Sequence, residues 1–266
     1  MGKRIFLAGA TSAIGKRLIP LLTQAGHHVV GTTRSTVKAE TLARSGIEPV
    51  VVDVFDADAL NRAVKTAEPE IVIHQLTALP PGLDPALMGE ALKANARVRK
   101  EGTQNLVHAA QGVGVRRLIA QSLAWVYMPG PQPFTEASPL YTGAIDELDV
   151  SKRGVIALED SVMNAAPIEG IVLRYGRMYG PGTGFDSPPS ALPLHVDAAA
   201  YAAFLSIDHG GPGAYNIAEP NDEVATAKAV ADLGWNPAFR LPMKKSAPYM
   251  KEVRRFGAGR FSLYSS

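Results

Sequence analysis

A glycine-containing turn near the N-terminus has the composition of a phosphate-binding loop. Residues 9–15 read Gly-Ala-Thr-Ser-Ala-Ile-Gly and lie between an apolar run, Arg4–Ala8, and a helix-forming segment, Ala13–Ala25. Glycine permits the tight turn, so that backbone N–H groups and the positive end of the helix can approach a pyrophosphate. The alternative is an ordinary turn between a strand and a helix. We expect a dinucleotide site formed by Gly9, Thr11, Ser12, Ala13, Ile14 and Gly15.

The residues after the second expected strand, His28–Thr32, indicate which dinucleotide is bound. NAD-binding proteins place a carboxylate at this point for the ribose hydroxyl, whereas a basic residue binds the 2′-phosphate of NADP. Here Thr33 and Arg34 follow the strand, without a carboxylate. We therefore expect NADP in preference to NAD, with Arg34 on the 2′-phosphate. The alternative is a surface arginine at the start of the next helix.

Alternating strand-like and helix-like segments predict the fold that would position these residues. Short β-rich runs separated by amphipathic segments are typical of a parallel sheet covered on both faces. The expected strands are Arg4–Ala8, His28–Thr32, Pro49–Val52, Ile71–His74, Arg117–Gln121, Gly170–Arg174 and a short Gly213–Ile217. The expected helices are Ala13–Ala25, Lys38–Ser45, Ala57–Ala67, Pro85–Gly112, Val150–Ala165, His195–Ser206 and Ala225–Leu233. The fold class is α/β, a Rossmann-type doubly wound sheet.

The regular alternation of strand-like and helix-like segments becomes less clear after Arg174. There Tyr179–Pro193 is rich in proline and glycine, which predicts a loop. We expect a dinucleotide-binding domain over residues 1–175. Residues 176–266 would form a small, shortened substrate region packed on it.

Several motifs in sequence order resemble a known family. The glycine turn is similar to Gly-x-x-Gly-x-x-Gly with Ser12 at the middle position, and Leu173–Gly182 is similar to Leu-Arg-x-x-x-x-Tyr-Gly-Pro-Gly. Further matches are Gln121–Tyr127, Leu194–Asp197, Tyr215–Ile217 and Leu233–Pro237. Together they resemble the extended, atypical short-chain dehydrogenase/reductases, namely the NAD(P)-dependent epimerase/dehydratase family.

The resemblance implies roles for residues elsewhere in the chain. It places Asp53 on the adenine amino group with Val54 beside it, although a helix cap or turn would also use an aspartate there. Family members use a Ser or Thr after the fifth strand and a Tyr-x-x-x-Lys pair for proton transfer. Here Ser122 is the hydroxyl at the strand end, although Leu123 falls at the family's Ser or Thr position. Lys152 is the lysine, which the resemblance also places on the nicotinamide ribose, and Leu148 stands at the position of the tyrosine. The alternative for Lys152 is an exposed helix lysine.

The resemblance implies hydride transfer between the nicotinamide and a small hydroxyl- or carbonyl-bearing substrate of sugar type. The rival hypothesis is a catalytically silent NADP(H)-binding sensor or interaction protein, which Leu148 and the shortened substrate region favour. The family often forms homodimers through two long helices, here Pro85–Gly112 and Val150–Ala165.

Composition and charge bear on the partners, metal sites and cellular location to be expected. A net charge of +2 over 266 residues gives no reason to expect a nucleic-acid or membrane partner, and the basic C-terminal segment reads as a solvated end. There is no cysteine, the six histidines lack metal-ligand spacing, and the apolar run near the N-terminus is too short for a signal peptide. We expect a cytoplasmic protein without a metal site.

Overall fold

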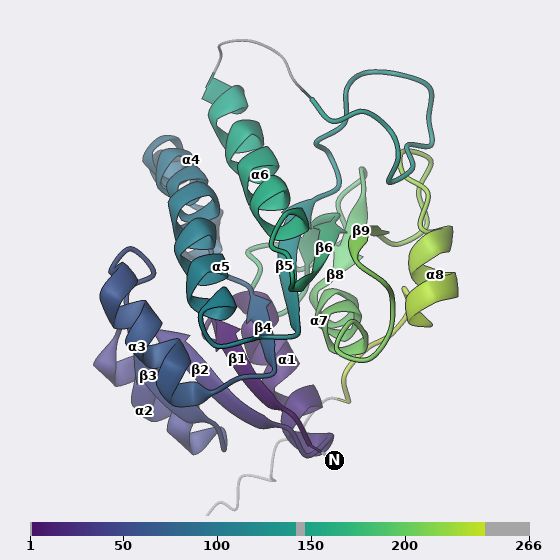
Figure 1. The fold of residues 1–266 in the computed structure, drawn as a ribbon. Coiled ribbons are helices and arrows are strands. Elements are labelled where there is room, and N and C mark those ends of the chain that lie inside the picture. The colour runs from purple at the N-terminus through teal and green to yellow at the C-terminus, as the bar shows by residue number, and fades with distance from the viewer. Residues whose placement is uncertain (1, 142–146, 243–266) are drawn as a thin grey trace, which may run out of the picture.

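A parallel sheet forms the centre of the molecule in the computed structural model, which describes residues 2–141 and 147–242 (Figure 1). Within that part of the chain the sheet has seven strands in the order β3-β2-β1-β4-β5-β6-β9, and each neighbouring pair is parallel. The strands are β1 (Arg4–Ala8), β2 (His28–Thr33), β3 (Glu48–Val51), β4 (Ile71–His74), β5 (Arg117–Leu123), β6 (Glu169–Tyr175) and β9 (Gly213–Ile217). The doubly wound fold predicted from the sequence is confirmed.

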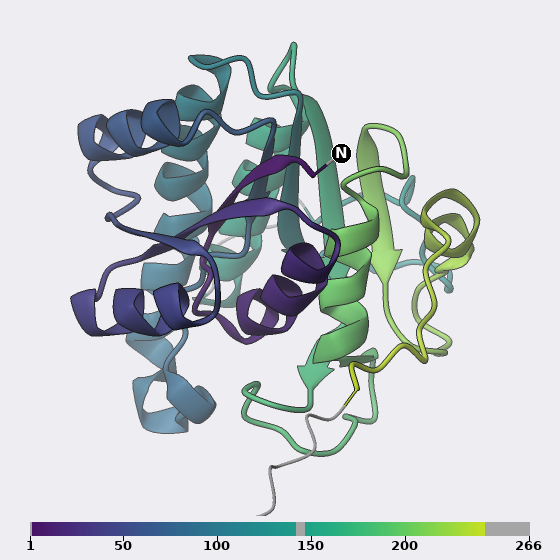
Figure 2. The ribbon, with the colours of Figure 1, turned by 90° about the horizontal axis from the view of Figure 1, so that it is seen from below.

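Helices connect successive strands and cover both faces of the sheet. They are α1 (Ala13–Gln24), α2 (Thr36–Arg44), α3 (Ala57–Ala67), α4 (Met88–Arg97), α5 (Thr103–Gln111), α6 (Glu147–Met163), α7 (Val196–Leu205) and α8 (Ala227–Leu233). Figure 2 shows α1 and α7 on one side of the sheet, with α3 and α5 on the other. A parallel sheet needs this double cover because both of its faces are apolar.

The two faces are separate hydrophobic cores, as strand geometry requires. Along β1, Ile5 and Leu7 pack with Leu18 of α1 and with α7, whereas Phe6 and Ala8 pack with α3, α5 and α6. Successive side chains of a strand point to opposite faces, so a run of apolar residues fills both cores. The run Ile-Phe-Leu-Ala therefore suits β1 to an interior position in the sheet, between β2 and β4.

The order in which strands are added to the sheet reverses at β1, and this reversal fixes where a ligand can bind. From β1 the chain runs to β2 and β3 on one side, then crosses to β4 and β5 on the other. In open sheets of this type, ligands bind in the crevice outside the carboxyl ends of the two neighbouring strands at which the strand order reverses. Here that crevice lies between the ends of β1 and β4, which pair from Ile5–Ile71 to Ala8–His74.

The long helix expected over Pro85–Gly112 is divided into several pieces. A 3₁₀ turn at Pro85–Leu87 precedes α4, and a π-helical turn at Val98–Gly102 separates α4 from α5. The extra residue of a π turn changes which side chains face the sheet, and such turns are frequent at functional sites. Arg99 lies in this turn and is buried.

Residues 176–242 are continuous with the sheet. β9 pairs with β6 from Ile171–Gly213 to Tyr175–Ile217, and α7 packs on α1. The division expected at residue 175 therefore passes through a single sheet and a single core. The segment expected as a loop, Tyr179–Pro193, is bounded by two short strands that pair with each other, β7 (Arg177–Tyr179) and β8 (Pro193–His195).

Candidate functional site

The glycine turn lies between the ends of β2 and β4. Gly9 has φ +88°, and a Cβ there would lie 2.4 Å from the carbonyl oxygen of Gln75, just after β4. On the other side, the N–H of Gly9 donates to Thr32 Oγ1 of β2 at 3.2 Å. A Cβ on Gly15 would lie 2.4 Å from the carbonyl oxygen of Gly9. Neither position has room for a side chain, so both glycines are needed for this turn to form.

Ser12 caps the helix that follows the turn. Its hydroxyl oxygen accepts a hydrogen bond from the N–H of Gly15 at 2.9 Å, and its φ of −67° needs no glycine. The N–H groups of Thr11, Ala13 and Ile14 donate to nothing within the described residues. Unpaired N–H groups at a helix N-terminus suit a pyrophosphate, so the turn fits the dinucleotide predicted for it. The serine in place of the middle glycine is compatible with that fit.

Arg34 follows β2 at the same edge of the sheet. Its side chain is exposed and forms no hydrogen bond or ion pair with the described part of the chain. Thr33, at the position of the usual carboxylate, is buried and accepts a hydrogen bond from the N–H of Ser35. The guanidinium is therefore available to an anion, with no carboxylate at the strand end to repel one.

Asp53 and Val54 lie in the turn between β3 and α3. One carboxylate oxygen of Asp53 accepts a hydrogen bond from the N–H of Phe55, and the side chain is exposed. Val54 is buried and its carbonyl accepts a hydrogen bond from Asn105 on α5. Asp53 thus has the turn role that was its alternative interpretation, while its second oxygen has no partner among the described residues.

A glycine-rich turn after β7 extends across the crevice. At one end, a Cβ on Gly182 would lie 3.9 Å from the Cβ of Ala13, the first residue of α1. At the other, a Cβ on Gly184 would lie 3.0 Å from the carbonyl of Gly82, which belongs to the segment after β4. Residues 180–184 therefore run from the phosphate turn to the opposite wall, where they would border a bound nicotinamide and its substrate.

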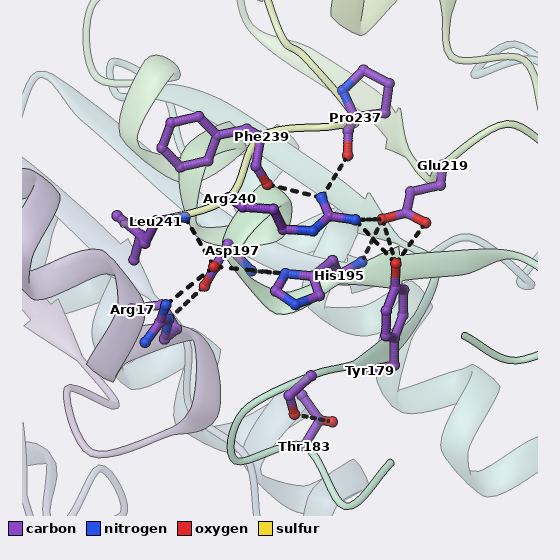
Figure 3. A network of polar contacts seen from close by, with 11 residues as sticks. Arg17, Tyr179, Thr183, His195, Asp197, Glu219, Pro237, Phe239, Arg240 and Leu241 are labelled. Atoms are coloured by element: carbon purple, nitrogen blue, oxygen red, sulfur yellow. Dashed lines mark hydrogen bonds and ion pairs between the residues drawn. The ribbon is translucent and has the colours of Figure 1, made fainter. Parts of the chain in front are cut away.

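Polar contacts hold this turn and the segment after α8 in place (Figure 3). Glu219 accepts hydrogen bonds from the Tyr179 hydroxyl at 3.0 Å and from Arg240 at 2.8 Å. Asp197 accepts from Arg17 of α1 and from the backbone N–H of Leu241. These contacts fix the wall of the crevice. The basic residues from Lys244 onward, expected to form a solvated end, lie outside the described residues.

Ser122, predicted as a catalytic hydroxyl, belongs to a buried structural network instead. Its side chain is 3% exposed and donates to Glu159 of α6 at 2.5 Å. Glu159 in turn forms an ion pair with Arg174 of β6 at 2.7 Å, in which both side chains are 4% exposed. The neighbouring strand residues Gln121 and Leu123 are half-buried. We therefore revise the prediction: Ser122 holds α6 against β5 and β6.

Lys152 is on α6 and contacts an aromatic ring from a different segment. Its Nζ lies 3.7 Å from the centre of the Tyr141 ring, in the loop that leads from β5 to α6. Lys152 is half-buried and forms no hydrogen bond or ion pair with the described residues. An ammonium over a ring face is attracted by the π electrons. The side chain of Leu148 lies outside the described part of the structure.

Two buried basic groups lie between α6 and the end of β4. His74 is fully buried and shares a hydrogen bond with Thr103 at 2.9 Å, and burial together with nearby Arg99 lowers its pKa to about 4. Arg99 donates to the hydroxyl of Ser151, the neighbour of Lys152, and burial lowers its pKa to about 10. Within the described residues Arg99 has no carboxylate partner.

Sequence reasoning included Tyr179, His195 and Asp197 in its motif matches, but it did not predict their contacts in Figure 3 or the contact between Lys152 and Tyr141. Asp197 lies 180 residues after its partner Arg17 on α1, and Glu219 lies 40 residues after its partner Tyr179, so only the three-dimensional fold brings these groups together. No spacing relative to Lys152 marks Tyr141 in the sequence, because a loop has no fixed period. The described residues contain no group of three or more His, Asp or Glu that could hold a metal ion, and none of their helices is long and apolar enough to cross a membrane.

Comparison with known proteins places the chain among relatives. The model of the NAD dependent epimerase/dehydratase family matches residues 5–218. The chain belongs to this family. A 3-diazoavenalumate denitrifying reductase from Streptomyces sp is 37% identical over 236 residues, which cover 86% of this chain and 72% of the relative. A probable UDP-glucuronate 4-epimerase of Rhizobium meliloti is 27% identical over 210 residues, covering 73% of this chain and 58% of that protein.

Solved structures of the epimerase/dehydratase fold agree with the architecture. The UDP-glucose 4-epimerase of Thermotoga maritima has a TM-score of 0.70 at 18% identity, covering 89% of this chain and 94% of that one. The UDP-glucose 4-epimerase of Thermus thermophilus, solved with NAD, has a TM-score of 0.70 at 17% identity, covering 90% and 95%. At sequence identities this low, the similarity shows a shared fold only. The family itself is NAD-dependent, which supports the dinucleotide site at the glycine turn.

Proposed function

We propose that this protein is an NADP(H)-dependent reductase that delivers hydride to a small electrophilic substrate. The proposal rests on a set of groups at one edge of the sheet that could each bind a part of the cofactor. Within the described residues, the N–H groups of Thr11, Ala13 and Ile14 are unpaired and the side chain of Arg34 has no partner. Lys152 lies on the helix where the family holds the nicotinamide ribose. When bound, the reduced nicotinamide supplies the hydride.

The cofactor preference rests on charge at the end of β2. The exposed Arg34 guanidinium has no partner in residues 2–141 and 147–242, so among these residues no ion pair must break before it forms two parallel hydrogen bonds to a phosphate. The Thermus thermophilus structure was solved with NAD, so the preference of this chain for NADP over NAD has to be measured. The adenosine end of the cofactor would lie between Arg34 and Asp53, whose second oxygen is available to the adenine amino group.

The substrate is expected to be smaller than a nucleotide sugar. The connection from β7 to β8 consists of only residues 180–192, and its first part already crosses the crevice between Ala13 and Gly82. A small carbonyl compound fits this description. A diazo acid is the second candidate, since the relative named as a 3-diazoavenalumate denitrifying reductase is similar over most of the chain.

A cofactor-binding protein without catalysis is the competing function. Leu123 and Leu148 occupy the positions at which the family pattern has a hydroxyl and a phenol, and neither can move a proton. Binding would then serve a sensing or partner interaction. The experiment below separates the two functions.

Calorimetric titration with NADPH and NADH, followed by oxidation of NADPH in the presence of defined acceptors, tests the proposal. The acceptors are D-erythrulose, L-xylulose, 3-diazoavenalumate and UDP-glucuronate. We expect NADPH to bind more tightly than NADH and to be oxidised by one of the small acceptors, but not by UDP-glucuronate. Failure of NADPH to bind would contradict the cofactor site. Firm binding without oxidation by any acceptor would favour the silent binder.

We also propose that the protein acts as a cytoplasmic homodimer through α4 and α6, which pack side by side (Figure 1). The absence of cysteine suits a reducing compartment. Light scattering of the purified protein tests the dimer, and a monomer mass at working concentration would contradict it.

A further inference from the structure

The contact between Tyr141 and Lys152 supplies what the helix lacks. In the family pattern a tyrosine four residues before the lysine exchanges the proton, and here that position is Leu148. The structure places another phenol ring 3.7 Å from the lysine Nζ, from a loop instead of the preceding helical turn. The chain therefore has a tyrosine beside its lysine at the edge of the sheet where the cofactor residues lie.

The backbone at Tyr141 is held against the end of β5. Its N–H donates to the carbonyl of Val126 at 2.7 Å, and the N–H of Met128 donates to the carbonyl of Pro139 at 2.9 Å. Tyr127 and Leu140 form an antiparallel bridge between these two bonds. Val126 follows β5 by only three residues, so this short pairing fixes Tyr141 relative to the sheet rather than leaving it on a free loop.

A buried polar network supports this pairing. The Tyr127 hydroxyl donates to Asn216 of β9 at 2.6 Å and accepts from Arg174 of β6 at 2.9 Å. The carbonyl of Glu136, in the loop itself, accepts from Arg174 as well. The loop that carries Tyr141 is thus anchored to two strands of the central sheet. A group that exchanges a proton must be held in position by rigid elements of this kind.

We propose that Tyr141 is the proton donor of the reductase, taking the place of the tyrosine that the family carries on the helix. The inference rests on the proposed function. As hydride adds to the carbonyl carbon, the C=O π pair moves to oxygen, and that oxygen takes the proton of the Tyr141 hydroxyl. The phenolate then regains a proton from solvent. Lys152, fixed over the ring, stabilises the negative charge left on the phenol during the transfer.

The first test is made on the protein without cofactor and needs no substrate. Ultraviolet difference titration follows ionisation of the tyrosines, and subtracting Tyr141→Phe from the wild type isolates one phenol. We expect this phenol to ionise at a lower pH with Lys152 present than in a Lys152→Met background, by about one pH unit, because an adjacent cation favours the phenolate. Lys152→Arg, which keeps the charge, should resemble the wild type. Equal titration in all backgrounds would overturn the proposal.

The second test compares binding with turnover. Tyr141→Phe should leave the NADPH dissociation constant within about twofold of wild type while slowing reduction of the most active carbonyl acceptor, D-erythrulose or L-xylulose, about a hundredfold or more. The control is Tyr201→Phe, which removes a hydroxyl from a ring of α7 that stacks on Phe239. Unchanged turnover in Tyr141→Phe would overturn the proposal. A wild type that oxidises no NADPH would refute the proposed reductase, while the phenol titration would still decide whether Tyr141 and Lys152 act as a pair.

A rescue variant guards against a purely structural effect of the substitution. Tyr141→Phe combined with Leu148→Tyr restores a phenol four residues before Lys152, where one helical turn brings both side chains to the same face. We expect this double variant to recover part of the lost turnover. No recovery, together with a lowered unfolding temperature in Tyr141→Phe, would assign Tyr141 a structural role and overturn the proposal.

Discussion

Replacement of Ser122 by alanine distinguishes a structural hydroxyl from a catalytic one. The substitution removes the donor that contacts Glu159 at 2.5 Å while leaving the ion pair between Glu159 and Arg174 in place. In the variant, two nitrogens of Arg174 still donate to the carboxylate of Glu159. The change therefore removes one hydrogen bond to a charged acceptor and no other polar contact.

The expected loss of stability follows from the burial of all three groups. A hydrogen bond to a charged group contributes about 1.5–3 kcal/mol, and here solvent cannot replace the donor because Ser122 and Glu159 are each 3% exposed. For a chain of this size each kcal/mol corresponds to a shift of about 2–4 °C in the unfolding midpoint, so we expect a fall of about 3–12 °C. Cofactor affinity should not change.

Urea unfolding and thermal unfolding of wild type and variant measure this difference, with NADPH titration alongside. Ser161→Ala is the matched control. Ser161 lies on α6, the helix that carries Glu159, and its hydroxyl donates only to the carbonyl of Ala157 one turn earlier. Its effect should stay within about 0.5 kcal/mol. If Ser122→Ala were as stable as wild type yet had lost turnover, the hydroxyl would act in the chemistry and our revision of its role would be refuted.

Three further predictions concern the cofactor site and pH. Arg34→Ala should weaken NADPH binding by about 1.5–3 kcal/mol without changing NADH binding, whereas Arg44→Ala, on the exposed end of α2, should change neither; equal losses for both cofactors in calorimetry would contradict the assignment. Burial holds the pKa of His74 at about 4, below its ordinary value of 6.5. The contribution of the neutral imidazole to stability is therefore complete above about pH 6.5. Stability should fall by about 3 kcal/mol between pH 6.5 and 4 as the unfolded chain takes up the proton, and His74→Asn should remove that part of the slope in urea unfolding; an unchanged slope would contradict it. Gly9→Ala should unfold at lower temperature than wild type, because its Cβ meets the carbonyl of Gln75; a stable variant would show that the turn tolerates a side chain.

The central sheet could be predicted from the sequence because its signals are local. Each strand is a short apolar run, and a turn or capping residue marks most helix starts, as Ser12 does for α1 and Asp56 for α3. The short strands β7 and β8 were not predicted. They are three residues each and pair only with one another across a proline-rich segment, so no periodic pattern marks them.

How far the sequence could predict the surroundings of each site residue depends on how local its contacts are. The role of Gly9 follows from its immediate neighbours in the chain, and the structure gives it the positive φ that the motif requires. The role of Ser122 depends on which face of β5 its side chain takes, and the partner that decides this, Glu159, is 37 residues away on α6. The pairing of Tyr141 with Lys152 depends on the path of a loop, which no residue pattern specifies.

Calorimetric titration of two Ser12 variants with NADPH tests the central claim, that the glycine turn binds the cofactor pyrophosphate, most directly. Asparagine and aspartate both cap a helix, so both should preserve the bond now made to Gly15 and the stability of α1. Only aspartate places a negative charge beside the pyrophosphate, and this repulsion amounts to about 1–3 kcal/mol near a protein surface. We predict binding of one NADPH per chain to wild type and Ser12→Asn, and about ten- to hundredfold weaker binding to a stably folded Ser12→Asp. Equal affinity in all three proteins would contradict the account.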